Sequence, residues 1–218
     1  MKKLVIFDLD GTLLNTIADL GEATNYALQK NGYPTHPVDG YPLMVGNGVN
    51  MLLFRALPEK ARSMETALSL KPDFLEYYDG HNMVNTRPYP EIESLLRRLA
   101  DAGVALAVAS NKYERATLKL IRHYFPMVNW AAIEGQTDMR PVKPDPAIVF
   151  DILAKTGTAA DDALYVGDSG VDMLTAKNAG VESVGVTWGF RSEEEIRENG
   201  ACHIVHTADD IFHLACHV

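Results

Sequence analysis

After residue 90 the sequence alternates between helical stretches and short apolar runs, and this alternation constrains the fold more than any other feature. The apolar runs predict strands at residues 104–109, 130–134, 163–166 and 183–187, with a possible edge strand at 203–206. Buried strands that alternate with helices form parallel sheets with helices on both faces. We therefore expect an α/β fold with a doubly wound parallel sheet, and its first strand is the apolar run at residues 4–7.

The segment between residues 15 and 87 offers no strand candidate. Its periodicity and its Gly and Pro punctuation predict helices over residues 16–31, from Gly48 towards Leu57 and over residues 59–79. A proline-containing stretch at residues 87–90 predicts a stiff connector back to the sheet. The sequence thus predicts a helical insertion directly after the first strand.

Polar residues follow three of the predicted strands. Asp8 and Asp10 follow the first strand, Ser110 and Asn111 follow the strand at 104–109, and Asp168 follows the strand at 163–166. The carboxyl ends of parallel strands share one edge of the sheet, where ligands bind. Asp8 and Asp10 are two residues apart, so they start on one side of an extended chain and need a divalent cation or a shared proton between them. We expect the functional site at this edge.

Other residues strengthen this prediction, although each also has a plainer interpretation. Gly11 permits a tight turn that exposes its N–H, and Ser110 at a helix start can hold a phosphate oxygen. Prolines on both sides restrict the loop that carries Lys143, and Asp168 and Asp172 are four residues apart. The plainer interpretations are an Asp-Gly turn, a helix cap, a solvated lysine and acids at a helix N-terminus.

Four segments, taken in order, resemble the motifs of the haloacid-dehalogenase-like hydrolase superfamily. The segments are Asp8-Leu9-Asp10-Gly11-Thr12, Val108-Ala109-Ser110-Asn111-Lys112, Lys143-Pro144, and Gly167-Asp168-Ser169 with Asp172. Most members of this superfamily are phosphatases that work through an aspartyl-phosphate. The resemblance implies a Rossmann-like catalytic core, residues 1–14 and 88–218, and an inserted helical cap, residues 15–87. The implied activity is Mg²⁺-dependent hydrolysis of a small organic phosphate monoester.

The resemblance also implies a role for each residue. Asp8 would be the nucleophile and a Mg²⁺ ligand, and Asp10 would be the general acid and base while its main-chain carbonyl binds the metal. Asp168 would complete the metal site, with Asp172 supporting it. The residues implied to hold the phosphoryl group are Gly11, Thr12, Ser110, Asn111 and Lys143.

The predicted cap carries a weaker indication of the substrate. Met44-Val45-Gly46-Asn47-Gly48, followed by a helix that contains Arg55, resembles the same region of phosphoglycolate phosphatases. We therefore expect Gly46, Asn47, Gly48 and Arg55 to contact the substrate, although a plain glycine-rich turn explains the same residues. The loop at residues 35–50 has no Lys or Arg for Schiff-base chemistry, which disfavours the phosphonate-cleaving relatives. The presence of Asp10 disfavours dehalogenation.

Two other classes remain open at this stage. A phosphomutase of the same fold would keep the aspartyl-phosphate until it rephosphorylates a sugar, but the predicted cap loop lacks basic residues. A non-catalytic protein that binds a phosphate ligand would not need the complete set of acids, serine and lysine. Neither the pathway nor the choice between monomer and homodimer follows from the sequence.

Charge and cysteine content limit the partners and the compartment. The net charge is −9, which argues against a nucleic-acid partner and in favour of a small phosphate ester bound by local positive charge. The chain has two cysteines, no secretory signal and no apolar run of membrane-spanning length, so we expect a cytoplasmic protein that acts away from membranes. The C-terminal Cys and His residues do not match a common structural zinc site, and these residues are Cys202, His203, His206, His213, Cys216 and His217.

Overall fold

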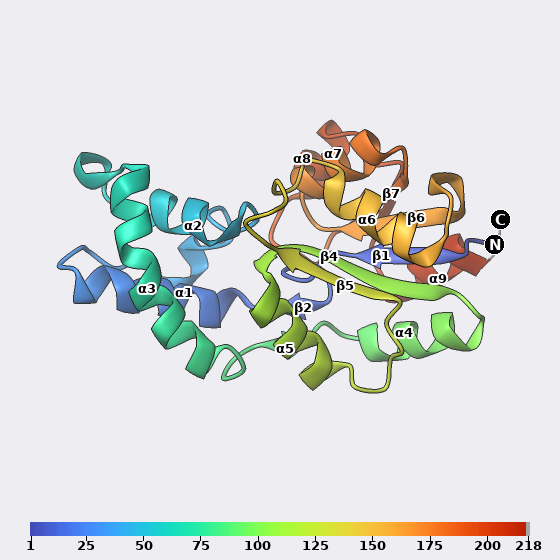
Figure 1. Ribbon diagram of the computed structural model, residues 1–218, viewed down its shortest axis with the longest axis horizontal. Coiled ribbons are helices and arrows are strands. Elements are labelled where there is room, and N and C mark those ends of the chain that lie inside the picture. Colours follow the sequence, from blue (N-terminus) through green and yellow to red (C-terminus); the bar gives the residue numbers. More distant parts are fainter. Residues whose placement is uncertain (217–218) are drawn as a thin grey trace.

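A computed structural model describes residues 1–216, and His217 therefore lies outside the described residues. Six parallel strands form one sheet in the order β5-β4-β1-β6-β7-β8, with helices on both faces (Figure 1). The strands are β1 (Leu4–Phe7), β4 (Ala105–Tyr113), β5 (Ala132–Gln136), β6 (Ala163–Gly167), β7 (Glu182–Val186) and β8 (His203–Val205). The predicted α/β, doubly wound parallel sheet is confirmed.

The side chains of β1 alternate between two apolar layers. Val5 and Phe7 face a cluster that includes α4 (Ile92–Asp101), α5 (Glu114–Tyr124) and α9 (Ala208–Cys216). Leu4 and Ile6 face a second cluster with α6 (Ala147–Thr156) and α7 (Gly170–Ala179). Because β1 is covered on both sides, it is apolar throughout, as parallel central strands are. The remaining elements of this part are η3 (Ala160–Asp162) and α8 (Glu193–Glu198).

Strand β4 is longer than the sequence predicts. The prediction ended it at Ala109 and began a helix at Ser110, which is wrong, because the chain stays extended to Tyr113 and α5 begins at Glu114. The cause is the neighbouring strand: after an irregularity, pairing with β5 resumes between Tyr113 and Gln136. Residues 110–112 therefore lie on an irregular strand end.

The three helices of residues 17–81 form a separate layer beside the sheet (Figure 1). They are α1 (Ile17–Lys30), α2 (Gly48–Ala56) and α3 (Met64–His81), with short turns η1 (Val38–Gly40) and η2 (Glu59–Ala61). Their apolar faces enclose a cluster of their own, which includes Leu53 and Phe74. The predicted helix over residues 59–79 is wrong at its start, because Ser63 caps α3 by accepting a hydrogen bond from the Thr66 N–H at 3.0 Å.

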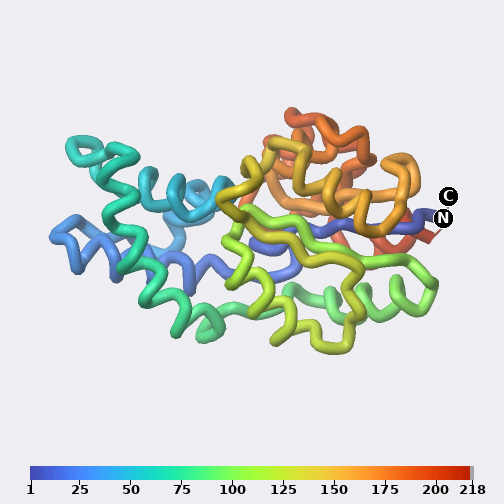
Figure 2. Tube along the Cα trace, in the orientation of Figure 1, coloured from blue at the N-terminus to red at the C-terminus, as the bar shows by residue number. Residues whose placement is uncertain are grey.

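Two neighbouring strands connect this helical layer to the sheet. The chain leaves at β2 (Leu14–Asn15) and returns at β3 (Arg87–Pro88), which pair antiparallel (Figure 2). Residues 16–86 contain no strand, as predicted, and the short pair, which the sequence did not predict, lies at the two boundaries of this segment. The Asp19 carboxylate accepts hydrogen bonds from the Thr86 N–H and hydroxyl at 2.9 and 2.7 Å, which fixes the return crossing. No helix within residues 1–216 is long and apolar enough to span a bilayer.

Candidate active site

The sheet brings the predicted acids together where its strand order reverses. β1 pairs with β4 on one side and with β6 on the other, so the residues that follow these strands meet at one edge. Asp8 directly follows β1, Asp168 directly follows β6, and Ser110 lies near the end of β4. Such a switch point is where open α/β sheets bind ligands.

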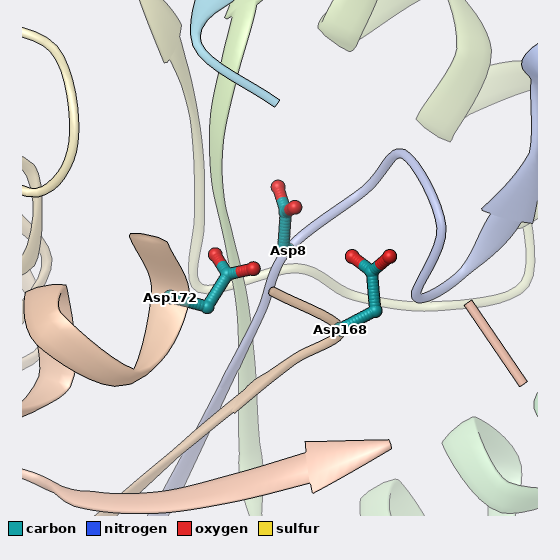
Figure 3. A group of neighbouring side chains, drawn as sticks. All are labelled: Asp8, Asp168 and Asp172. Atoms are coloured by element: carbon teal, nitrogen blue, oxygen red, sulfur yellow. The ribbon is translucent and has the colours of Figure 1, made fainter. Parts of the chain in front are cut away.

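Three buried carboxylates form an acidic cluster at this point: Asp8, Asp168 and Asp172. One oxygen from each lies within 4.8 Å of the others, and Figure 3 shows the three side chains turned toward a common space. Asp172 is placed by a capping box at the start of α7, in which the Ser169 N–H donates to Asp172 Oδ2 at 3.2 Å and the Asp172 N–H donates to Ser169 Oγ at 3.4 Å. The Ser169 hydroxyl also donates to Asp172 Oδ2 at 2.6 Å. A Cβ at Gly167 would lie 2.3 Å from the Asp172 Cβ, so this close approach requires glycine.

Lys143 supplies the positive charge inside this cluster. Its Nζ donates to Asp172 Oδ1 at 2.7 Å, to the Tyr165 hydroxyl at 2.9 Å and to the Ala109 carbonyl at 3.0 Å. The same Nζ lies 3.0 Å from Asp8 Oδ1, but Oδ1 accepts no well-aligned hydrogen bond and is buried. Although burial opposes it, attraction to Asp172 and Asp8 raises the pKa of Lys143 well above its usual value. The lysine is therefore an ammonium.

One ammonium does not balance three buried carboxylates. Burial raises the pKa of Asp8 to about 7, with repulsion from Asp172 and Asp10 adding to the effect and Lys143 opposing it. Burial, followed by repulsion from Asp172 and Asp8, raises the pKa of Asp168 well above its usual value. The Asp8 oxygen without a hydrogen bond and the surplus negative charge fit a hard divalent cation with oxygen ligands, which would relieve both.

Asp10 lies beside the acidic cluster but has its own partners. Its Oδ1 accepts a hydrogen bond from the Thr16 hydroxyl at 2.7 Å, and its Oδ2 pairs with Lys112 Nζ at 3.0 Å. The Lys112 side chain is only 3% exposed, and its Nζ lies 4.7 Å from the centre of the Tyr78 ring of α3. Sequence reasoning missed Lys112, although its position directly after Ser110 and Asn111 at a strand end was a usable signal.

Of the residues predicted to hold a phosphoryl group, Gly11 and Thr12 lie against Asp168, whereas Ser110 lines the cavity. Gly11 adopts a φ of +90°, and a Cβ there would lie 2.3 Å from Asp168 Oδ2, so glycine is required beside the cluster. The Thr12 hydroxyl donates to Asp168 Oδ1 at 3.4 Å, which supports the acidic cluster. Ser110 lines the cavity in front of Asp8 and Asp168, and its hydroxyl accepts a hydrogen bond from the Lys112 N–H at 3.2 Å.

The Asn111 side chain bonds to main-chain groups of two other segments. Its Oδ1 accepts a hydrogen bond from the Lys143 N–H at 2.8 Å, and its Nδ2 donates to the carbonyls of Gly46 at 3.0 Å and Lys143 at 3.2 Å. Both ends of the carboxamide are thus bound to the main chain. The side chain therefore links the Lys143 loop to the turn before α2, while Asn111 also lines the cavity, and its predicted contact with phosphate stays a prediction.

A cavity separates the acidic cluster from the helical layer, and both parts of the molecule line it. Of the four predicted cap contacts, Gly46 and Gly48 line this cavity, whereas Asn47 and Arg55 do not. Arg55 instead donates to Asn47 Oδ1 at 2.6 Å and to the Met44 carbonyl at 2.9 Å, so it braces the turn. The expected contact of Asn47 and Arg55 with the substrate stays a prediction, and in this structure the two side chains bond to each other.

Arg191, which follows β7, does line the cavity and was missed by sequence reasoning. It lies in a loop without a motif, so only the tertiary structure reveals its position.

Two of the C-terminal histidines have ordinary partners: His203 contacts Glu182, and His206 contacts Thr187. Within residues 1–216, the acidic cluster is the one group of three or more possible metal ligands.

The fold and the acidic cluster agree with the sequence comparison. The family described as haloacid dehalogenase-like hydrolase matches residues 5–186, and the chain belongs to this family. The resemblance found in the four motifs is therefore confirmed.

Within the family the chain is similar to phosphoglycolate phosphatases. Phosphoglycolate phosphatase from Mesorhizobium japonicum is 35% identical over 199 residues, which cover 90% of this chain and 87% of that protein. Phosphoglycolate phosphatase 1 from Pseudomonas aeruginosa is 32% identical over 223 residues, which cover 99% of this chain and 80% of that protein. A crystal structure from Lactobacillus delbrueckii subsp. bulgaricus, provisionally named a phosphoglycolate phosphatase, matches with a TM-score of 0.93 at 31% identity, and 100% of each chain is covered. These comparisons confirm the predicted enzyme class, a phosphoric monoester hydrolase that resembles phosphoglycolate phosphatases.

Proposed function

We propose that this protein is a Mg²⁺-dependent phosphatase that hydrolyses a small organic phosphate monoester through an aspartyl-phosphate on Asp8. The observation that carries the proposal is the acidic cluster of Asp8, Asp168 and Asp172 at the strand-order reversal, with Lys143 inside it. Three buried carboxylates and one ammonium leave negative charge that must be neutralised before a phosphate dianion can approach.

In this proposal Asp8, Asp168 and the main-chain carbonyl of Asp10 would hold Mg²⁺, with Asp172 supporting them. The bound ion would supply positive charge that keeps Asp8 ionised and neutralises the phosphate oxygens. A carboxylate needs no general base to act as a nucleophile once it is ionised.

The chemical steps are assigned to side chains of the core. An Asp8 oxygen forms a bond to phosphorus while the ester bond breaks, and Asp10 gives a proton to the departing alkoxide. Asp10 then takes a proton from the water that attacks phosphorus, which releases inorganic phosphate and restores Asp8. Lys143 and Ser110 stabilise charge on the phosphoryl oxygens.

We also propose the division of labour along the chain. Residues 1–14 and 88–218 form the catalytic core, and residues 15–87 form a helical cap that covers the site and excludes water. The support is the separate apolar cluster of α1, α2 and α3 and the paired crossing of β2 and β3.

Phosphoglycolate is the substrate that we propose. The relatives named above are phosphoglycolate phosphatases, and the cavity offers Lys112 and Arg191 beyond the lysine in the acidic cluster. A second anionic group on the substrate, such as a carboxylate, would complement this positive charge.

We further propose that the protein acts in the cytoplasm, because both Cys202 and Cys216 are free.

A screen of small phosphate esters with and without Mg²⁺ tests this function. We expect turnover that requires Mg²⁺ and is fastest with phosphoglycolate. Mg²⁺-dependent turnover with another ester preferred would overturn the substrate and leave the chemistry. Equal turnover in a chelator would overturn the metal, and no turnover with any ester would overturn the phosphatase function.

A further inference from the structure

Residues 42–46, between η1 and α2, contact the core beside the acidic cluster; we call this segment the docking turn. It presents main-chain carbonyls to donors of the core, and these carbonyls belong to Pro42, Val45 and Gly46. A turn that offers acceptors to the core is a docking element, in contrast to a cradle of amides for an anion.

Arg191 holds the first part of the docking turn. Its guanidinium donates to the carbonyls of Pro42 and, at 2.6 Å, of Val45. Its Nε lies 3.4 Å from Glu195, and that carboxylate also accepts a hydrogen bond from the Gly170 N–H at 3.2 Å. The Arg191 side chain is 10% exposed, so a cation with few water contacts depends on these acceptors.

The loop that carries Arg191 also touches the acidic cluster. The N–H of Phe190 donates to Asp168 Oδ2 at 2.7 Å. A Cβ at Gly189 would lie 2.2 Å from the Asp168 Cβ, so the main chain of this loop packs directly on Asp168. One three-residue stretch therefore connects the docking turn to a proposed metal ligand.

Asn111 makes the corresponding connection on the other side. Its Nδ2 donates to the Gly46 carbonyl, while its Oδ1 accepts a hydrogen bond from the Lys143 N–H. The approach is close, because a Cβ at Gly48 would lie 2.7 Å from Gln136 Oε1 and 3.3 Å from the Asn111 carbonyl. The docking turn thus reaches both Asp168 and Lys143 through one intermediate loop each.

We propose that Arg191 and Asn111 are positioning residues that couple docking of the cap to the geometry of the reaction centre. The proposal rests on the phosphatase function above and adds that the position of the cap controls the activity. When the docking turn moves away from the core, Arg191 and Asn111 lose their hydrogen bonds to its carbonyls. The segments that position Asp168 and Lys143 are then held by fewer contacts. The reaction centre is complete only when the cap is docked.

The test uses Arg191→Met and Arg191→Lys in the full chain, with Arg197→Met as the control. Arg197 suits this purpose because its side chain is 67% exposed and forms a surface ion pair with Glu193 of α8. The measurements are amide hydrogen exchange of residues 42–46 and Mg²⁺ affinity by calorimetry, followed by kcat and KM with p-nitrophenyl phosphate. Melting temperatures show that each variant is folded, and Arg191→Lys keeps the charge if Arg191→Met is too unstable.

We expect Arg191→Met to accelerate exchange in the docking turn and to weaken Mg²⁺ binding about 10-fold, the usual scale for a residue that orients a metal ligand. kcat should fall by a similar factor while KM changes less. Arg191→Lys should lie between wild type and Arg191→Met, because a lysine cannot hold two carbonyls in a fork, and Arg197→Met should match wild type.

The proposal is overturned if amide exchange becomes faster while Mg²⁺ affinity and kcat are unchanged. Arg191 would then hold the docking turn without affecting the reaction centre. Unchanged exchange would show that Arg191 does not hold the docking turn, which also overturns it. Exchange and Mg²⁺ binding remain readable in an enzyme that hydrolyses no ester, so failure of the proposed function is distinguishable from failure of this inference.

Discussion

The two walls of the cavity are built from opposite kinds of side chain. The core wall carries charged and polar groups, namely Asp8, Asp10, Ser110, Asn111, Lys112 and Asp168. The cap wall is largely apolar, and its side chains are Leu20, Val45, Val49, Leu52, Phe74 and Tyr78. The core wall is also buried: Asp8, Ser110, Lys112 and Asp168 are shielded from solvent, as are Lys143 and Asp172 next to them.

On the proposed function, we infer that the core wall performs the chemistry and binds the charged groups of the substrate, whereas the cap wall limits the shape of the substrate. Buried charges are costly unless each has a partner in fixed geometry, so the core wall tolerates little change. An apolar wall discriminates by shape, and a change there costs less because no charge loses its partner. We therefore expect core substitutions to affect every substrate and cap substitutions to affect some.

Removing the nucleophile is the most severe change to the core wall. Asp8→Asn keeps the size of the side chain but abolishes the charged oxygen, so kcat should fall roughly 10⁴-fold or more for all esters. Steady-state kinetics on a folded variant measures this. Substantial residual turnover in Asp8→Asn would contradict the covalent mechanism.

Removal of divalent ions should also stop turnover of every ester. Without the ion, the free energy of unfolding should depend on pH, because the buried carboxylates of the acidic cluster then bind protons. The pKa of Asp8 is raised to about 7, whereas an unfolded chain has its usual lower value. Between about pH 4 and 7 the folded, metal-free protein therefore binds a proton that the unfolded chain has lost, so its stability falls as the pH rises through that window.

Mg²⁺ takes the place of this proton. We expect Mg²⁺ at a fixed concentration, about 100 times its Kd above pH 7, to raise the melting temperature by roughly 5–10 °C above pH 7 and by less near pH 5, where protons compete for the site. Thermal unfolding with Mg²⁺ and with a chelator measures both. A gain that is equal at the two pH values would indicate that the ion does not compete with a proton on the acidic cluster.

Asp10→Asn should have a smaller and more selective effect. It preserves the main-chain carbonyl and the side-chain size, but removes the proton donor, so turnover of alkyl esters should fall roughly 10²–10⁴-fold. Nitrophenyl phosphate, whose leaving group needs no proton, should be slowed far less. Equal losses on the two esters would mean that Asp10 is not the general acid.

The cap wall should respond most weakly. Gly48 has a φ of +79° and lies against Gln136, so Gly48→Val should displace the turn and raise KM for phosphoglycolate about 10-fold, with less effect on a neutral ester. Asn47→Ala removes the Arg55 acceptor that braces the same turn but leaves the cavity lining intact, so it should raise KM for phosphoglycolate by less, about two-fold. Equal losses on both esters in Gly48→Val would show that the turn only shapes the cap.

The sequence predicts the core far better than the meeting of core and cap. The proximity of Asp8 and Asp168 was predictable, because the carboxyl ends of parallel strands lie at one edge of the sheet and the motifs mark these ends in the sequence. The length of β4 escaped prediction because pairing with β5, which is not local, keeps the chain extended to Tyr113. Arg191 escaped because its acceptors are carbonyls of Pro42 and Val45, which leave no trace in the sequence. Contacts made by main-chain groups of distant loops depend on the tertiary structure alone.

The most direct test of the account is to look for phosphate on Asp8 itself. Wild-type enzyme mixed with phosphoglycolate and Mg²⁺, quenched in acid within the first turnover and digested, can be analysed by mass spectrometry. We predict that phosphate is found on the peptide that contains Asp8, that it appears no later than free phosphate, and that Asp8→Asn and chelated samples lack it. Steady release of phosphate with none bound to this peptide at any quench time would contradict the aspartyl-phosphate mechanism.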